Sequence, residues 1–213
     1  MTSLLTEPIS GVLDRLHTAA LRDDDLDIAP LPSDASAEQR ADALASAYLP
    51  VSAQGGRLLY SLVRSARPQT IVEFGTSYGI STLYLAAAVR DNGVGRVTTT
   101  ELSSTKVAAA RANLLEAGVA QLVDVLAGDA LQILGTIDGP IGLVLLDGWK
   151  DLYLPVLQLL EPRLAPGALV IADDSNFATV QHYLDYVRDP ASGYLSVNFP
   201  VEDGMEISCR IDS

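Results

Sequence analysis

Three carboxylate side chains stand in two short stretches that each follow an apolar run. Asp147 follows the run 141–146, and Asp173 and Asp174 follow the run 168–172. If these runs are neighbouring strands of an open parallel sheet, their carboxyl ends meet on the ligand-binding side of that sheet. Carboxylates so close together repel one another unless a cation lies among them, and hard oxygen ligands suit Mg²⁺. The three residues are therefore candidate magnesium ligands, although Asp173 or Asp174 could instead cap the following helix.

A lysine follows the first of these aspartates by three residues. Lys150 is close enough in sequence to Asp147 to approach a substrate bound at the same metal. Burial and a nearby cation both lower the pKa of a lysine, and a lowered pKa allows lysine to act as a general base. The metal would also acidify a hydroxyl group that it binds, so that the oxygen becomes nucleophilic. Trp149 and Tyr153 could form walls around a flat aromatic substrate, or they could pack as ordinary residues at the sheet edge.

A glycine-containing turn at 75–79 follows an earlier apolar run and opens an alanine-rich helix. Gly75 and Gly79 let the backbone turn tightly and approach a ligand at the start of that helix. Dinucleotide-binding turns usually carry three glycines, so the nicotinamide hypothesis is weakened. Glu73, which comes just before the turn, would repel a pyrophosphate but suits a cationic ligand.

Two more acidic residues stand at the ends of the next two predicted strands. Glu101 is placed to accept hydrogen bonds from both hydroxyls of a ribose, the alternative being an exposed strand end. Asp129, beside Gly128, is placed to bind an adenine amino group, although Asp is also a favoured helix N-cap. Together with the glycine turn, these residues predict a nucleoside site along successive strand ends.

The elements that must position these side chains follow from the pattern of apolar runs. From residue 69 onward, short apolar runs alternate with longer amphipathic ones, which is typical of βαβ units and a mostly parallel sheet. The predicted strands are 70–74, 96–101, 122–127, 141–147 and 168–173, and the predicted helices are 80–90, 103–117, 130–134, 151–164 and 177–188. Two closing strands, 194–199 and 205–211, predict an antiparallel edge. Upstream, helices are predicted at 9–21 and from Ser36 to Ala47.

Length and composition favour one soluble enzyme domain. The chain has 213 residues, of which 48% are hydrophobic and 19% charged, so we expect a single domain over 1–213, with a helical extension at 1–50 and a core at 51–213. The formal net charge of -13 argues against a nucleic-acid partner. A single cysteine, no basic and apolar leader, and no apolar run of about 20 residues indicate a cytoplasmic protein without a membrane segment. The oligomeric state is left open, a homodimer included.

Two motifs carry a family resemblance. The set Gly75, Gly79, Glu101 and Asp129 resembles the class I S-adenosylmethionine-dependent methyltransferases over roughly 66–213. The sequence LDGWKDLYLP at 146–155, followed by VIADD at 170–174, is similar to the Mg²⁺-dependent catechol O-methyltransferases. This resemblance implies a Rossmann-like α/β fold with a mostly parallel seven-stranded sheet, one antiparallel edge strand and helices on both faces. It also implies S-adenosylmethionine and Mg²⁺ as cofactors and a small catechol-like or phenolic substrate.

Residue by residue, the resemblance assigns a metal role to Asp147, Asp173 and Asp174, a catalytic role to Asp147 and Lys150, and substrate contacts to Trp149, Lys150 and Tyr153. The segment 51–56 resembles the family's segment over the methionine part of the cofactor. The residues assigned to the cofactor are Val51, Glu73, Gly75, Ser77, Gly79, Ser81, Glu101, Leu102, Gly128, Asp129, Ala130 and Asp147.

Three positions depart from the family pattern. Asp174 stands where the family usually has Asn, and Gly148 replaces a bulkier residue that lies against the adenine. The glutamate that holds the second hydroxyl in animal catechol enzymes is not found near 197–198. The alternatives are a metal-independent methyltransferase, a non-catalytic S-adenosylmethionine-binding subunit and, less well supported, a nicotinamide oxidoreductase.

Overall fold

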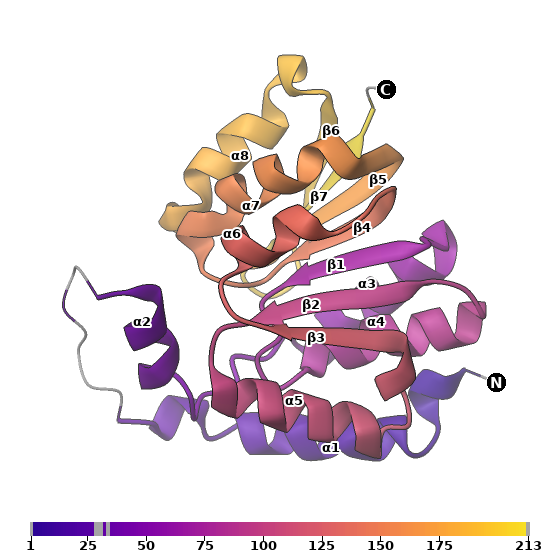
Figure 1. Cartoon of the computed structure of the whole chain (residues 1–213), viewed down its shortest axis with the longest axis vertical. Helices are drawn as coiled ribbons and strands as arrows, with labels where there is room; N and C mark the ends of the chain where they lie inside the picture. The colour runs from indigo at the N-terminus through magenta and orange to yellow at the C-terminus, as the bar shows by residue number, and fades with distance from the viewer. Residues whose placement is uncertain (1, 28–31, 33–34, 212–213) are drawn as a thin grey trace.

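A seven-stranded mixed sheet forms the centre of the protein (Figure 1). The structure is a computed structural model that describes residues 2–27, 32 and 35–211. The strands lie in the order β3-β2-β1-β4-β5-β7-β6, and β7 runs antiparallel to both of its neighbours, β5 and β6. The strands are β1 (Thr70–Phe74), β2 (Arg96–Glu101), β3 (Val123–Ala127), β4 (Ile141–Leu146), β5 (Leu164–Ala172), β6 (Tyr194–Phe199) and β7 (Met205–Arg210). The predicted mostly parallel sheet with its antiparallel edge is confirmed; β7 is inserted between β5 and the outermost β6.

Consecutive strand residues point to opposite faces of the sheet, and both faces are covered. In β4, Leu143 and Leu145 belong to one apolar cluster, whereas Val144 and Leu146 belong to the other. The first cluster also contains residues of α1 (Ile9–Ala20), α3 (Ala53–Ala66), α4 (Ile80–Asn92) and α5 (Ser104–Glu116). The second contains residues of α6 (Ala130–Ile133), α7 (Tyr153–Leu160) and α8 (Gln181–Arg188), which lie over the other face (Figure 1). The central strands are therefore buried on both sides, as continuous apolar runs require.

The strand order reverses between β1 and β4, which pair with each other in parallel. From β1 the sheet continues to β2 and β3, and from β4 it continues to β5 on the other side. Such a reversal leaves a crevice at the carboxyl ends of the strands, because the following loops turn away from one another there. The segments after β1 and β4, which contain most of the predicted site residues, both start at this crevice.

The predicted helix 151–164 was too long at both ends. Lys150–Leu152 and Glu161–Arg163 form 3₁₀ turns, and β5 begins at Leu164, earlier than predicted. Pro162 lies in the second of these turns, and a proline has no backbone N–H with which to continue a helix. Other predicted elements are confirmed to within a few residues.

Helix α3 was not predicted from the sequence. Two adjacent glycines, Gly55 and Gly56, disfavour a helix on propensity alone. The Ser52 side chain caps the helix by accepting the Gly55 N–H at 3.1 Å. A Cβ at Gly56 would collide with the ring of Tyr84 on α4. The glycine thus lets two helices pack closely, which a propensity argument cannot reveal.

The N-terminal residues pack on the core as helices. Helix α1 confirms the predicted helix 9–21, and α2 (Ala37–Ala43) is shorter than the predicted helix from Ser36 to Ala47. Ser36 and Gln39 form a reciprocal capping box at the start of α2. Figure 1 shows α2 beyond the arrowheads of the central strands. Within the described part of the chain, no helix combines the length and apolar character needed to cross a bilayer.

Candidate active site

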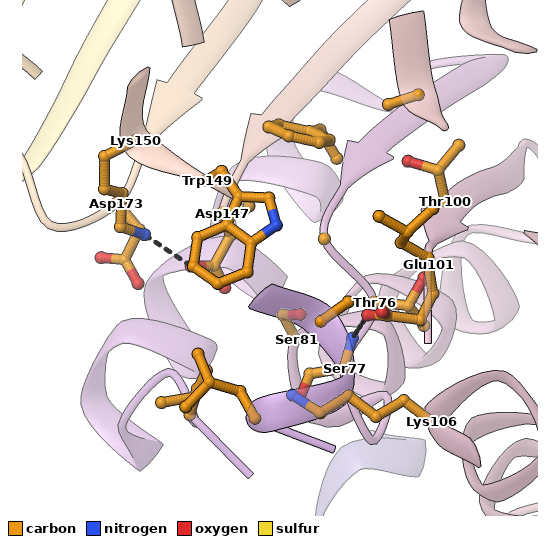
Figure 2. A pocket seen from close by; sticks show the side chains of 18 of the residues that line it. Thr76, Ser77, Ser81, Thr100, Glu101, Lys106, Asp147, Trp149, Lys150 and Asp173 are labelled. Atoms are coloured by element: carbon orange, nitrogen blue, oxygen red, sulfur yellow. Dashed lines mark hydrogen bonds and ion pairs between the residues drawn. The ribbon is translucent and has the colours of Figure 1, made fainter. Parts of the chain in front are cut away.

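A cavity of about 520 Å³ opens at the carboxyl ends of the central strands. Figure 2 shows Asp147, Lys150 and Asp173 at one side of it and Ser77, Thr100 and Glu101 at the other. The site residues predicted from the sequence that line it are Val51, Gly75, Ser77, Ser81, Glu101, Leu102, Gly128, Asp129, Ala130, Asp147, Trp149, Lys150, Asp173 and Asp174. One cavity therefore joins the predicted nucleoside end to the predicted chemical end.

The turn after β1 needs glycine for two separate reasons. Gly75 has a φ of 102°, and a Cβ there would lie 2.5 Å from the carbonyl oxygen of Asp147. Gly79 has a φ of 87° and is the N-cap of α4. A backbone in the left-handed region and the close approach of two segments of the chain both exclude ordinary side chains. Gly79 does not itself line the cavity, so its role is to shape the turn.

Glu101 holds two backbone segments at the nucleoside end. Its carboxylate accepts the N–H groups of Ser77 and Ser103, each at 2.8 Å. Each carboxylate oxygen can accept more than one hydrogen bond, so both oxygens retain acceptor capacity toward the cavity. Ser77 Oγ donates to the carbonyl of Tyr48 at 2.7 Å, which ties the turn to the N-terminal segment.

The prediction that Glu73 faces a cationic ligand was wrong about its position. Glu73 is fully buried and does not line the cavity, because its carboxylate accepts Ser81 Oγ at 2.7 Å and Thr82 Oγ1 at 2.5 Å. Burial raises the pKa of Glu73, and the hydroxyl donors oppose that rise. Glu73 is therefore linked to the cavity through its hydrogen bond from Ser81, which does line it.

Asp129 is a helix N-cap and also lines the cavity, so its cap role is confirmed and its adenine role stays a prediction. Its carboxylate accepts the Leu131 N–H at 2.9 Å and Gln132 Nε2 at 3.2 Å, so it caps α6. It also lines the cavity beside Gly128 and Ala130. Capping does not exhaust its acceptors, since a carboxylate offers about four lone-pair sites.

The three aspartates of the chemical end converge. Ligand oxygens of Asp147, Asp173 and Asp174 lie within 4.8 Å of one another. The backbone brings them there, because the Asp147 N–H donates to Phe74 at the end of β1 and the Asp173 N–H donates to Leu146 at the end of β4. The capping alternative is not supported, since neither Ala178–Val180 nor α8 begins with a side-chain cap.

This cluster fits a divalent cation. Within the described residues, Asp173 Oδ1 is buried without a hydrogen-bond partner, which is costly unless a ligand satisfies it. Burial and the neighbouring Asp174 raise the pKa of Asp173 to about 7. Burial also raises the pKa of Asp147, with Asp173 and Asp174 adding to the rise against Lys150. Carboxylates that resist ionisation together become good hard ligands once a cation offsets their charge.

Lys150 lies among these carboxylates, and they raise its pKa. Its Nζ is 2.8 Å from Asp174 and 3.5 Å from Asp147, and it donates to the Tyr153 hydroxyl at 2.8 Å. Burial alone would lower the pKa of Lys150, but the attraction of Asp147 and Asp174 outweighs burial and raises it. The lowered pKa expected from the sequence depends on the charge of a bound cation, whereas the surrounding carboxylates act in the opposite direction.

Tyr153 does not form a wall of the cavity, contrary to prediction. It is fully buried, and its hydroxyl accepts from Lys150 and donates to the Asp173 carbonyl at 3.2 Å. Tyr153 is therefore a buried hydrogen-bond partner that fixes the position of the Lys150 ammonium group. Trp149 does line the cavity, as expected.

Phe74 occupies the space that the small residue at 148 leaves. A Cβ at Gly148 would lie 2.6 Å from Phe74 Cε1, and Phe74 lines the cavity. The aromatic ring at the end of β1 therefore supplies apolar contact area on this side of the cavity.

Several cavity residues were missed in the sequence. Lys106 on α5 is a buried charge whose pKa is lowered by burial, and Ala41 and Leu44 come from the N-terminal segment.

Glu202 also lines the cavity, with a left-handed φ of 51°. Burial raises its pKa, as do Asp174 and Asp203, against a backbone hydrogen bond from Ser52. The turn at 202–204 was visible in the sequence, but nothing local indicated that it folds back over the site.

Comparison with known proteins shows which families this chain is similar to. The family model of a methyltransferase domain matches residues 72–175. The chain is 35% identical over 144 residues to catechol O-methyltransferase of Mycobacterium tuberculosis, which covers 67% of this chain and 64% of that protein. It is 31% identical over 172 residues to catechol O-methyltransferase B of Danio rerio, covering 74% and 64%. The chain thus spans slightly less than two thirds of the length of these relatives.

Solved structures share the fold over nearly the whole chain. Cofactor-bound Rv0187 from MTB has a TM-score of 0.72 and 25% identity, covering 95% of this chain and 91% of that one. The O-methyltransferase TomG from Streptomyces achromogenes, in complex with SAM, has a TM-score of 0.70 and 25% identity, covering 94% and 99%. The chain therefore contains a methyltransferase domain with the Rossmann-like class I fold, and it is a homologue of the catechol O-methyltransferases.

Proposed function

We propose that this chain is an O-methyltransferase that moves the methyl group of S-adenosylmethionine to a hydroxyl of a small catechol-like or phenolic molecule, with Mg²⁺ at the site. One observation carries the proposal: a single cavity contains both Glu101 and the aspartates Asp147, Asp173 and Asp174. A nucleoside held at the first end would therefore extend toward a hydroxyl held at the second. The similarity to catechol O-methyltransferases supports the same reaction.

The cofactor would lie along the strand ends from Asp129 to Ser81. Glu101 would accept the ribose hydroxyls, because its oxygens retain acceptor capacity after binding two backbone N–H groups. Ser81 Oγ already donates to Glu73, so its oxygen is left as an acceptor toward the cavity. An acceptor there suits the ammonium of the methionine part. S-Adenosylmethionine supplies a methyl group on a positively charged sulfur, which is the electrophile.

The metal would be held by Asp147, Asp173 and Asp174, whose oxygens already converge. When bound, Mg²⁺ would lower the pKa of a substrate hydroxyl and fix its orientation. Its charge would also offset the carboxylates that now hold the proton of Lys150. Glu202, at the edge of the same cavity, is placed to accept a hydrogen bond from a second hydroxyl of the substrate.

Lys150 would be the general base. Tyr153 and Asp174 fix its Nζ at the chemical end. In its neutral form, Nζ would take the hydroxyl proton while the oxygen forms a bond to the methyl carbon and the carbon–sulfur bond breaks. The products would be the methyl ether, the neutral thioether and the lysine ammonium, so charge and protons balance.

The test is methyl transfer from labelled S-adenosylmethionine to a panel of catechols and monophenols. The protein is assayed after exhaustive chelation and again after Mg²⁺ is restored. We expect transfer that disappears on chelation and returns with Mg²⁺. Transfer that survives chelation would favour the metal-independent methyltransferase. Binding of S-adenosylhomocysteine without transfer to any acceptor would favour a non-catalytic subunit.

A further inference from the structure

Arg40 on α2 contacts the loop that carries the chemical residues. Its guanidinium carbon lies 5.0 Å from the centre of the Trp149 ring, and its Nη1 lies 3.5 Å from Asp151 Oδ2. These two partners flank Lys150 in the sequence. Arg40 therefore joins a helix of the N-terminal segment to the loop after β4.

The two segments that Arg40 joins also face the same space. Trp149 and Leu152 line the cavity from the loop after β4, and Ala37, Ala41 and Leu44 line it from α2 and the residue that follows. All five present apolar atoms, in contrast to the carboxylates deeper in the site. Figure 2 shows the Trp149 ring beside Asp147, so this apolar region adjoins the proposed metal ligands.

A guanidinium group suits this position for physical reasons. It is planar, so it can stack on an indole face while it donates to a carboxylate, which an ammonium does poorly. The Arg40 side chain is about one third exposed at 31%, and Trp149 is half-buried. Partial burial weakens competition from water and salt. The contact thus favours one orientation of the indole and one position of α2.

We propose that Arg40 is a specificity-determining positioning residue, which holds Trp149 and the apolar face of α2 as opposite walls of the substrate end. The spacing of these walls admits a flat ring and limits its bulk. Arg40 does not itself line the cavity, so it acts through Trp149. The substrate part of this inference rests on the proposed function, whereas the positioning of Trp149 does not.

The chain provides its own spectroscopic probe, because Trp149 is its single tryptophan. Acrylamide quenching of tryptophan fluorescence would be compared in the wild type, Arg40→Met and Arg40→Lys. Methionine keeps an apolar stem, so the variant is not expected to unfold. Arg64→Met is a matched control, because Arg64 lies 6.0 Å from the Tyr60 ring centre and 4.0 Å from Asp91, away from Trp149.

In Arg40→Met we expect the quenching constant to rise about twofold and KM for the phenolic acceptor to rise about threefold to tenfold, on the scale of one cation–π contact and one ion pair. S-Adenosylhomocysteine affinity should stay within about twofold, since Arg40 does not line the cavity. Arg40→Lys should restore little, because an ammonium does not stack as guanidinium does. Arg64→Met should match the wild type in both measurements.

Two results would overturn the inference. Unchanged quenching in Arg40→Met would show that Arg40 does not position Trp149. Altered quenching with an unchanged KM would show that the contact is structural only. If the wild type methylates no phenol, the proposed function fails, but the quenching comparison still decides whether Arg40 positions the indole.

Discussion

Lys150 Nζ lies 2.8 Å from Asp174 and 3.5 Å from Asp147, so one ammonium group bridges two of the three clustered carboxylates. The ammonium and a divalent cation would therefore both be drawn to these oxygens. The extra charge of Asp174, where the related enzymes usually have Asn, strengthens the hold on the lysine proton. The attraction of both cations to these oxygens is tested by the variants Lys150→Met, Asp173→Ala and Asp174→Asn.

Lys150→Met should lower kcat by about 10²–10⁴-fold, the usual contribution of a general base, while KM for S-adenosylmethionine changes little. A base must be deprotonated to work, so the wild-type kcat should fall as the pH drops below the pKa of Lys150 in the complex. The variant should lose this limb. The same limb and a rate within about threefold of the wild type would leave lysine without a catalytic role.

The metal ligands are tested by a pair of aspartate variants. Asp173→Ala should abolish Mg²⁺-dependent transfer, because it removes the oxygen that is buried without a partner in the described structure. Affinity for S-adenosylhomocysteine, measured by calorimetry, should be largely retained. Asp174→Asn should keep activity, because an amide oxygen still serves a hard cation and one repulsive charge disappears. Full activity of Asp173→Ala would contradict the assignment.

Glu101→Ala should weaken S-adenosylmethionine binding by about 1.5–3 kcal/mol, the scale of a hydrogen bond to a charged group. The same change releases the N–H groups of Ser77 and Ser103. Calorimetric titration measures the affinity. Glu116→Ala is the matched control, because Glu116 forms an exposed pair with Arg15. Equal affinities in the two variants would remove Glu101 from the cofactor site.

Gly148→Ala should destabilise the protein by about 1–3 kcal/mol, the usual cost of overpacking. The added methyl would lie 2.6 Å from the Phe74 ring. That ring has little freedom to move, because it packs edge-on against Tyr153 with centres 6.5 Å apart. Denaturant unfolding measures the loss. Gly135→Ala, which would meet only the flexible end of Leu159 at 3.3 Å, should cost clearly less.

Asp91 should make stability depend on pH. Burial would raise its pKa, but hydrogen bonds from Tyr60, Ser3 and Thr2 outweigh burial and lower it below the ordinary value. A depressed pKa in the folded state stabilises the protein above the unfolded pKa of about 4, and this stability is lost as the pH falls through the folded pKa. Asp91→Asn should therefore destabilise the protein at pH 7 and flatten the acid dependence of its unfolding free energy.

The acid dependence can be separated from general effects of removing a carboxylate. Asp138→Asn, at an exposed position, is the control and should retain the acid dependence of the wild type. Unfolding midpoints at neutral and acid pH would be compared for all three proteins. A wild-type dependence in Asp91→Asn would assign the titration to other carboxylates.

The sequence was sufficient to predict the sheet and the strand ends. Short apolar runs and the amphipathic stretches between them are local patterns, so β1 and β2 were predicted to the residue. The convergence of Asp147 with Asp173 also followed, because parallel strands bring their carboxyl ends together. These features depend on rules that hold for every open α/β sheet.

Side-chain direction and long-range contacts could not be predicted in this way. Glu73 ends the same strand as predicted but points to Ser81 and Thr82, away from the cavity. Tyr153 was predicted to contact a substrate, but it is fully buried and accepts a hydrogen bond from Lys150. Glu202 and Leu44 reach the cavity only through the packing of distant segments. In each case tertiary packing decided the outcome, and no local pattern reports it.

Helix α2 lies outside the region that the methyltransferase family model matches, which is 72–175. One wall of the proposed acceptor end is thus encoded outside the segment that carries Glu101 and the three aspartates. The same N-terminal stretch also anchors the turn after β1, because the Tyr48 carbonyl accepts from Ser77. Exchanging α2 alone between homologues, with residues 45–51 kept, would therefore replace the proposed acceptor wall and leave the anchor of that turn in place.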